Sequence, residues 1–105
     1  MRYVLVTGAY GGMGRRTVEL LRSQGFFVIA LDREVGEEED GILPIEADIT
    51  DADSVIRAYE KVLSVTDKLF AIIHFALSLK QGLCKKVKHY LHLKGNKNYT
   101  QVFTT

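Results

Sequence analysis

Four glycines fall within seven positions near the start of the chain: Gly8, Gly11, Gly12 and Gly14. They follow an apolar run over residues 3–6 and precede a segment with helical character. Glycine lets the main chain approach a ligand closely because it has no Cβ. A strand that delivers such a loop to a helix N-terminus presents free N–H groups and a partial positive charge to an anion. The segment therefore predicts phosphate binding, with a glycine-rich tight turn that binds nothing as the alternative.

Asp32 follows the next apolar run, residues 26–31, and stands 18 residues beyond Gly14. A carboxylate at the end of the second strand of a dinucleotide-binding unit can accept hydrogen bonds from the ribose hydroxyls of the adenosine, and it repels a 2′-phosphate. Glutamates and an aspartate at 34 and 37–40 add negative charge nearby, whereas the guanidinium of Arg33 can bind a 2′-phosphate. The balance favours NAD over NADP. The alternative for Asp32 is a solvated turn carboxylate.

Asp48 and Ile49 follow a third apolar run. The Asp48 carboxylate can accept a hydrogen bond from the adenine amino group while Ile49 packs on the ring. Helix capping by Asp48, Thr50 and Asp51 explains the same residues equally well. Thr50 and the carboxylate three positions later resemble a capping box.

The elements that must position these residues alternate along the chain. We expect strands over residues 2–7, 26–31, 42–47 and 69–76, a helix over 14–23, and a second helix that starts within residues 48–53 and runs to about 65. Alternation of this kind implies parallel pairing with right-handed crossovers. The predicted fold class is α/β: a Rossmann-type half domain with a parallel four-stranded sheet (order 3-2-1-4), flanking helices and an irregular basic tail. Pro44 predicts that the third strand lies at an edge.

The charge of the chain changes sign along its length. All 13 acidic residues lie at or before Asp67, and residues 68–105 contain seven lysines without an arginine or a carboxylate. We therefore expect a dinucleotide-binding domain over 1–77 and a lysine-rich tail over 78–105, which includes a possible short helix and a polar, β-prone end.

Three interpretations of the tail compete. The favoured one is the product of a truncated or frame-shifted reading. A second is a solvated helix over the sheet edge. The third is a basic arm for nucleic acid, with contacts from Lys85, Lys86, Lys88, His89 and Tyr90, which the short cluster and its lack of arginine disfavour.

Several features bound the cellular context. Cys84 is the only cysteine, so no internal disulfide forms and a reducing compartment is expected. The chain shows no basic leader with an apolar core, and no apolar run approaches the roughly 20 residues that span a bilayer. We expect a cytoplasmic protein with no membrane partner and no metal site.

Together these residues resemble the short-chain dehydrogenase/reductase superfamily. Thr7, Gly8, Gly12 and Gly14 match its glycine loop, and Asp32, Asp48 and Ile49 stand in register with its nucleotide contacts. The segment from His74 to Ala76 is similar to the extended or atypical branches. We expect His74 itself to be a packed strand residue, with a general base as the alternative. The resemblance covers residues 1–77 and implies a Rossmann fold, NAD(P) binding and hydride transfer to or from a carbonyl or alcohol. The cofactor contacts it implies are Gly8, Tyr10, Gly11, Gly12, Met13, Gly14, Asp32, Arg33, Asp48, Ile49, Phe75 and Ala76.

Catalysis by this chain is not predicted. Family members are usually more than twice this length, and their catalytic Ser and Tyr-x-x-x-Lys lie on the fifth strand and the next helix. Tyr90 and Lys94 have the spacing, but only 14 residues separate Tyr90 from Ala76, too few for the intervening helix and strand. We expect an NAD(H)-binding protein or fragment without its own catalytic residues. The alternative is a non-catalytic dinucleotide-sensing or nucleic-acid-binding module that uses the tail.

The fourth strand normally has a fifth as its neighbour. Unless the tail or another chain supplies that neighbour, an apolar edge stays exposed. We therefore expect a homodimer through this edge, or a marginally stable monomer.

Overall fold

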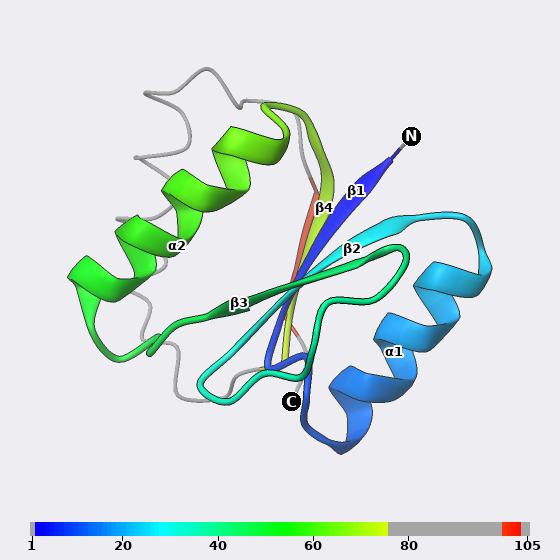
Figure 1. Cartoon of the computed structure of the whole chain (residues 1–105), viewed down its shortest axis with the longest axis horizontal. Helices are drawn as coiled ribbons and strands as arrows, with labels where there is room; N and C mark the ends of the chain where they lie inside the picture. The colour runs from blue at the N-terminus through cyan, green and yellow to red at the C-terminus, as the bar shows by residue number, and fades with distance from the viewer. Residues whose placement is uncertain (1, 76–99, 104–105) are drawn as a thin grey trace.

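The computed structural model describes residues 2–75 and 100–103, the latter segment by its backbone pairing alone. Over residues 2–75, strands and helices alternate, except that one loop joins the second strand directly to the third (Figure 1). The elements are β1 (Tyr3–Thr7), α1 (Gly12–Ser23), β2 (Phe27–Asp32), β3 (Ile42–Glu46), α2 (Ala52–Val65), β4 (Leu69–His74) and β5 (Thr100–Phe103).

The strands form one parallel sheet in the order β3-β2-β1-β4-β5. The predicted order of the first four strands is confirmed, and β3, which contains Pro44, lies at an edge as expected. Thr7 pairs in register with Leu31 on one side and His74 on the other. The carboxyl ends of the three central strands therefore meet at one rim of the sheet.

The fifth strand is the neighbour of β4 that we expected the tail or another chain to supply, and it comes from the tail. Thr100–Phe103 pairs in parallel with Ala71–His74, so part of the tail is regular rather than irregular. The unmet N–H and C=O groups of a parallel edge strand favour such an addition. β5 occupies the edge of β4 over Ala71–His74, through which we expected a homodimer. Dimerisation through an exposed sheet edge stays a prediction. The lysine cluster, Cys84, Tyr90 and Lys94 lie outside the described residues.

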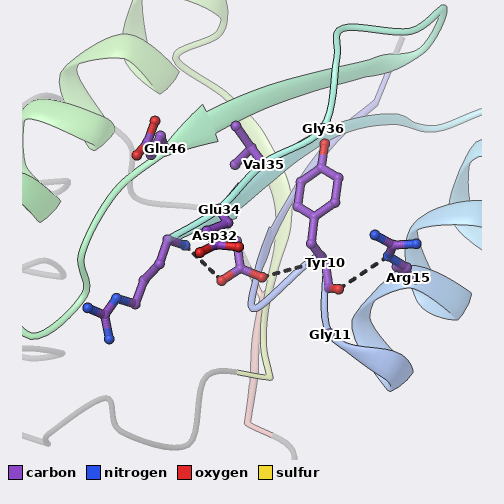
Figure 2. A pocket seen from close by; sticks show the side chains of 9 residues that line it. Tyr10, Gly11, Arg15, Asp32, Glu34, Val35, Gly36 and Glu46 are labelled. Carbon is purple, nitrogen blue, oxygen red and sulfur yellow. Dashed lines mark hydrogen bonds between the residues drawn. The ribbon is translucent and has the colours of Figure 1, made fainter.

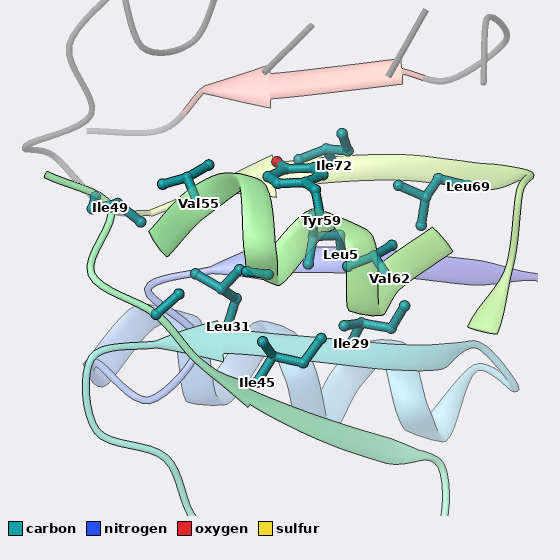
Figure 3. Packing of buried hydrophobic residues seen from close by; sticks show 12 residues of the cluster. Leu5, Ile29, Leu31, Ile45, Ile49, Val55, Tyr59, Val62, Leu69 and Ile72 are labelled. Atoms are coloured by element: carbon teal, nitrogen blue, oxygen red, sulfur yellow. The ribbon is translucent and has the colours of Figure 1, made fainter. Parts of the chain in front are cut away.

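In the described part of the chain, α1 covers one face of the sheet and α2 the other (Figure 1), and each face has its own apolar cluster. The α2 face packs Leu5, Ile29 and Leu31 from the sheet against Tyr59 and Val62 (Figure 3). The α1 face carries smaller buried residues, among which are Ala9, Val18 and Ala30. Small side chains let α1 approach the sheet closely at the rim where the glycine loop lies.

The start of α2 differs from the predicted capping box. The N-cap is Asp51, whose carboxylate accepts a hydrogen bond from the Asp53 N–H at 3.1 Å. The N–H and the hydroxyl of Thr50 both donate to Asp48 Oδ1. Thr50 therefore belongs to the turn that precedes the helix and does not cap it. Among the residues that the structure describes, no helix has the length and apolar character needed to cross a bilayer.

Candidate functional site

The glycine loop connects β1 to α1 at the carboxyl rim of the sheet. Gly8 has φ of +69°, a conformation that L side chains rarely adopt. A Cβ on Gly14 would lie 2.0 Å from the Gly8 carbonyl oxygen, so the first turn of α1 rests directly on the loop. Gly8 and Gly14 are therefore required by the fold itself.

The other two loop glycines have a different environment. A Cβ on Gly12 would meet no atom within 4 Å, and one on Gly11 would make only an ordinary contact with the Gly8 oxygen at 3.6 Å. Gly11 is the N-cap of α1 in an extended conformation, without a side-chain cap, and the first turn contains no acidic residue. Met13 is 62% exposed in the same turn. The helix N-terminus is thus open, and its partial positive charge is not offset by a local carboxylate.

Asp32 joins the glycine loop to the end of β2. Its Oδ2 accepts a hydrogen bond from the Tyr10 N–H at 2.9 Å, and its Oδ1 accepts one from the Arg33 N–H at 2.7 Å (Figure 2). The Asp32 side chain is half-buried, so one edge of the carboxylate faces the loop while the other lone pairs remain available. Two backbone donors hold the carboxylate in one orientation.

An open pocket of about 900 Å³ lies beside this carboxylate. It contains four of the predicted site residues: Tyr10, Gly11, Asp32 and Arg33. Five further residues line it, of which the sequence named only Glu34, for its negative charge near Asp32: Arg15, Glu34, Val35, Gly36 and Glu46. For Glu46 a signal was available, because it ends β3 in register with Asp32 at the end of β2.

Tyr10, Arg15 and Gly36 line both this pocket and a smaller one of about 370 Å³, whose lining includes Val18 of α1 and Ile42. Figure 2 shows the Tyr10 ring directed toward Gly36, where a Cβ would lie 3.1 Å from the ring. The Arg15 Nε donates to the Tyr10 carbonyl at 3.2 Å, and the guanidinium carbon lies 6.0 Å from the ring centroid. Within the described part of the chain, the buried Tyr10 hydroxyl has no hydrogen-bond partner. Tyr10 therefore fixes the position of Arg15 at the pocket.

Asp48 and Ile49 lie outside the lining of the pocket. The two hydrogen bonds from Thr50, first the hydroxyl and then the N–H, lower the pKa of the Asp48 carboxyl, and the charge of Arg33 acts in the same direction. Ile49 is only 7% exposed and packs in the α2-side cluster. An adenine contact of either residue stays a prediction.

The end of β4 is tied to the end of β1. His74 is 4% exposed, and its Nδ1 lies 3.1 Å from the Thr7 hydroxyl, which confirms that it is a packed strand residue. The Phe75 N–H donates to the Thr7 carbonyl at 2.9 Å, and its ring packs on the α1-side cluster. Ala76 lies outside the described residues. Within the described residues, no three potential metal ligands come together.

A parallel sheet with a glycine loop, an open helix N-terminus and an acidic residue at the end of the second strand defines a nucleotide-binding α/β domain. The family model described as short chain dehydrogenase matches residues 2–89. The chain therefore belongs to the short chain dehydrogenase family.

Individual relatives extend this result. A 3-ketodihydrosphingosine reductase of Bacteroides thetaiotaomicron is 30% identical over 73 residues, which are 70% of this chain and 27% of that protein. A short chain dehydrogenase family protein from Francisella tularensis superposes over 99% of this chain and 50% of its own, with a TM-score of 0.70 and 22% identity. A 3-ketoacyl-(acyl-carrier-protein) reductase from Brucella melitensis complexed with NADH gives a TM-score of 0.62 at 23% identity, over 90% of this chain and 45% of that one. The two structures support the fold, and this chain spans half or less of each relative.

Proposed function

We propose that this chain binds NAD(H) at the carboxyl rim of its sheet, as the nucleotide-binding part of a short chain dehydrogenase. The observation that carries the proposal is the Asp32 carboxylate. Backbone N–H groups of Tyr10 and Arg33 hold it at the edge of a 900 Å³ pocket, beside an uncapped helix N-terminus. Anionic pyrophosphate and a ribose diol are the two groups that such a pair of features recognises.

The ligand contacts follow from the chain order of the site. The pyrophosphate lies on the glycine loop, with Gly8 and Gly14 shaping it and Tyr10, Gly11, Gly12 and Met13 around it. Asp32 accepts hydrogen bonds from the adenosine ribose, with Arg33 next to it. Asp48 and Ile49 contact the adenine, while Phe75 and Ala76 line the crevice toward the nicotinamide.

Selection of NAD rather than NADP rests on charge. Asp32, Glu34 and Glu46 give the pocket three carboxylates against the guanidinium groups of Arg15 and Arg33. A 2′-phosphate carries close to two negative charges at neutral pH. In this proposal the repulsion by the half-buried Asp32 carboxylate at the ribose exceeds the attraction from the exposed Arg33 guanidinium, which solvent screens more strongly.

The chemistry of the whole protein is, in this proposal, NAD-dependent interconversion of a carbonyl and an alcohol in the cytoplasm. The bound dinucleotide supplies or accepts the hydride. Residues 1–77 bind it, and we assign no catalytic residue in this chain. Tyr90 and Lys94 lie outside the described residues and are given no role.

Calorimetric titration with NAD and with NADP tests the proposal. The wild-type chain binds NAD more tightly than NADP, and D32A weakens NAD binding at least about tenfold, because charge-assisted hydrogen bonds to the ribose are lost. D32N tests charge with the side-chain size retained, and it weakens NAD binding less than D32A. D67A removes an exposed carboxylate beyond the end of α2 and leaves the affinity unchanged. Failure of the folded wild-type chain to bind either dinucleotide contradicts the proposal.

A further inference from the structure

Glu46 is an acidic residue of the pocket that the glycine loop and the ribose site do not explain. It is the last residue of β3 and pairs in register with Asp32, the last residue of β2. Neighbouring strands lie about 4.8 Å apart, so the two side chains start one strand spacing from each other. Figure 2 shows Glu46 and Tyr10 on opposite sides of Asp32 in that view, and all three line the same pocket.

Among the described residues, neither cation of the pocket forms an ion pair with Glu46. Arg15 is held against Tyr10 by a hydrogen bond and by the ring. The charge of Arg33 acts on Asp48, where it helps to lower the pKa of that carboxyl. In the part of the chain that the structure describes, the ion pairs all involve Arg22, which leaves Glu46 exposed and without an ion-pair partner. The Glu46 carboxylate can therefore repel an anionic ligand group that binds in the pocket beside Asp32.

We propose that Glu46 is a second specificity-determining carboxylate, which acts with Asp32 to select NAD against NADP. The inference rests on the proposed function and assigns part of its selectivity to a residue on a different strand. NAD and NADP share the same pyrophosphate, so the repulsion between that group and Glu46 cancels in the ratio of their dissociation constants. The 2′-phosphate adds close to two negative charges on the ribose next to Asp32, and only NADP carries them. The strands that end at Asp32 and Glu46 lie about 4.8 Å apart, which is less than the Debye length of about 8 Å at physiological salt.

The test measures the ratio of the NADP to the NAD dissociation constant by calorimetry for a charge series at position 46. E46Q keeps the shape of the side chain and lowers the ratio about three- to tenfold, because one nearby negative charge disappears. E46K lowers it further in the same direction. E60Q removes an exposed carboxylate on α2, outside the pocket, and leaves the ratio at the wild-type value. Thermal unfolding of each variant checks that the chain stays folded.

The outcomes separate this inference from the proposed function. A wild-type chain that binds neither dinucleotide overturns the proposed function, and the inference with it. A wild-type chain that binds dinucleotide, together with an E46Q ratio equal to that of E60Q, overturns the role of Glu46 alone. A graded fall of the ratio from wild type through E46Q to E46K supports it.

Discussion

The two helices of this chain begin in opposite ways, although both are amphipathic and both pack on the same sheet. α2 supplies its own anions, because Asp51 caps its first turn and Asp53 lies within that turn. α1 begins at Gly11 with no side-chain cap and no acidic residue in its first turn. Orphan N–H groups at a helix start need an acceptor, which a side chain, water or a ligand provides.

The N-terminus of α2 is completed by side chains of the chain itself, whereas that of α1 is left open for a ligand. At α2 the acceptors are covalently part of the chain, so its N-terminus is complete without any other molecule. At α1 the equivalent position is occupied by glycines, two of which the fold does not need for space. In our proposal the pyrophosphate accepts hydrogen bonds at the start of α1, as the Asp51 carboxylate does at the start of α2.

The largest expected effect is a difference in stability between substitutions at Gly14, which contacts the loop, and at Gly12, which faces open space. G14A places a Cβ 2.0 Å from the Gly8 oxygen, where backbone must move, and we expect it to destabilise the chain by about 3 kcal/mol. G12A meets open space, so its unfolding free energy stays within about 1 kcal/mol of wild type. Urea unfolding followed by circular dichroism measures both. Equal stability of the two variants would contradict the close contact between Gly14 and the loop.

A second substitution gives α1 the kind of cap that α2 has. Gly11 is extended and has room for a Cβ, so we expect G11D to fold and to gain a few tenths of a kcal/mol from capping. The same carboxylate occupies the anion position and weakens NAD binding at least about tenfold. The matched variant D51A removes the cap of α2. It costs about 1 kcal/mol of stability and leaves the NAD affinity unchanged. If G11D binds NAD as tightly as wild type, the α1 N-terminus does not hold the pyrophosphate.

The smallest effect concerns the acidic turn before α2. Because the bonds from Thr50 lower the pKa of the Asp48 carboxyl below its ordinary 3.8, the ionised form favours the folded state. This contribution is fully present above that ordinary value and is lost as the pH falls through the lower pKa of the folded chain. The urea midpoint of wild type therefore exceeds that of D48N at neutral pH, and the gap narrows below about pH 4. A gap that stays constant from pH 7 to pH 2.5 would contradict the assignment.

Much of the fold follows from the sequence because apolar runs of strand length mark buried parallel strands. The predicted strands over 2–7 and 42–47 agree with β1 and β3 to within one residue at each end. The sequence indicated only a β-prone end for the tail, because the four residues of β5 are too few to show a periodicity and the strand depends on the edge of β4. The capping box at Thr50 was wrong because Asp48 takes both donors of Thr50 first.

The site was only partly predictable. The glycine loop and Asp32 carry local signals, and both line or border the pocket. Arg15, Gly36 and Glu46 come from three separate segments, and their meeting depends on loop geometry and strand register. Hydrophobic periodicity assigns a residue to an element, but it does not say which side chains converge at the strand ends.

The measurement that tests the central claim most directly is the change of backbone amide resonances in a ¹⁵N-labelled chain on addition of NAD. The account predicts large shifts for the N–H groups of Gly12, Met13 and Gly14 at the open start of α1. It predicts no comparable shifts for Ala52, Asp53 and Ser54, whose helix start is already capped. Saturating NAD that leaves the three α1 amides unmoved, or that moves both helix starts equally, would contradict the account.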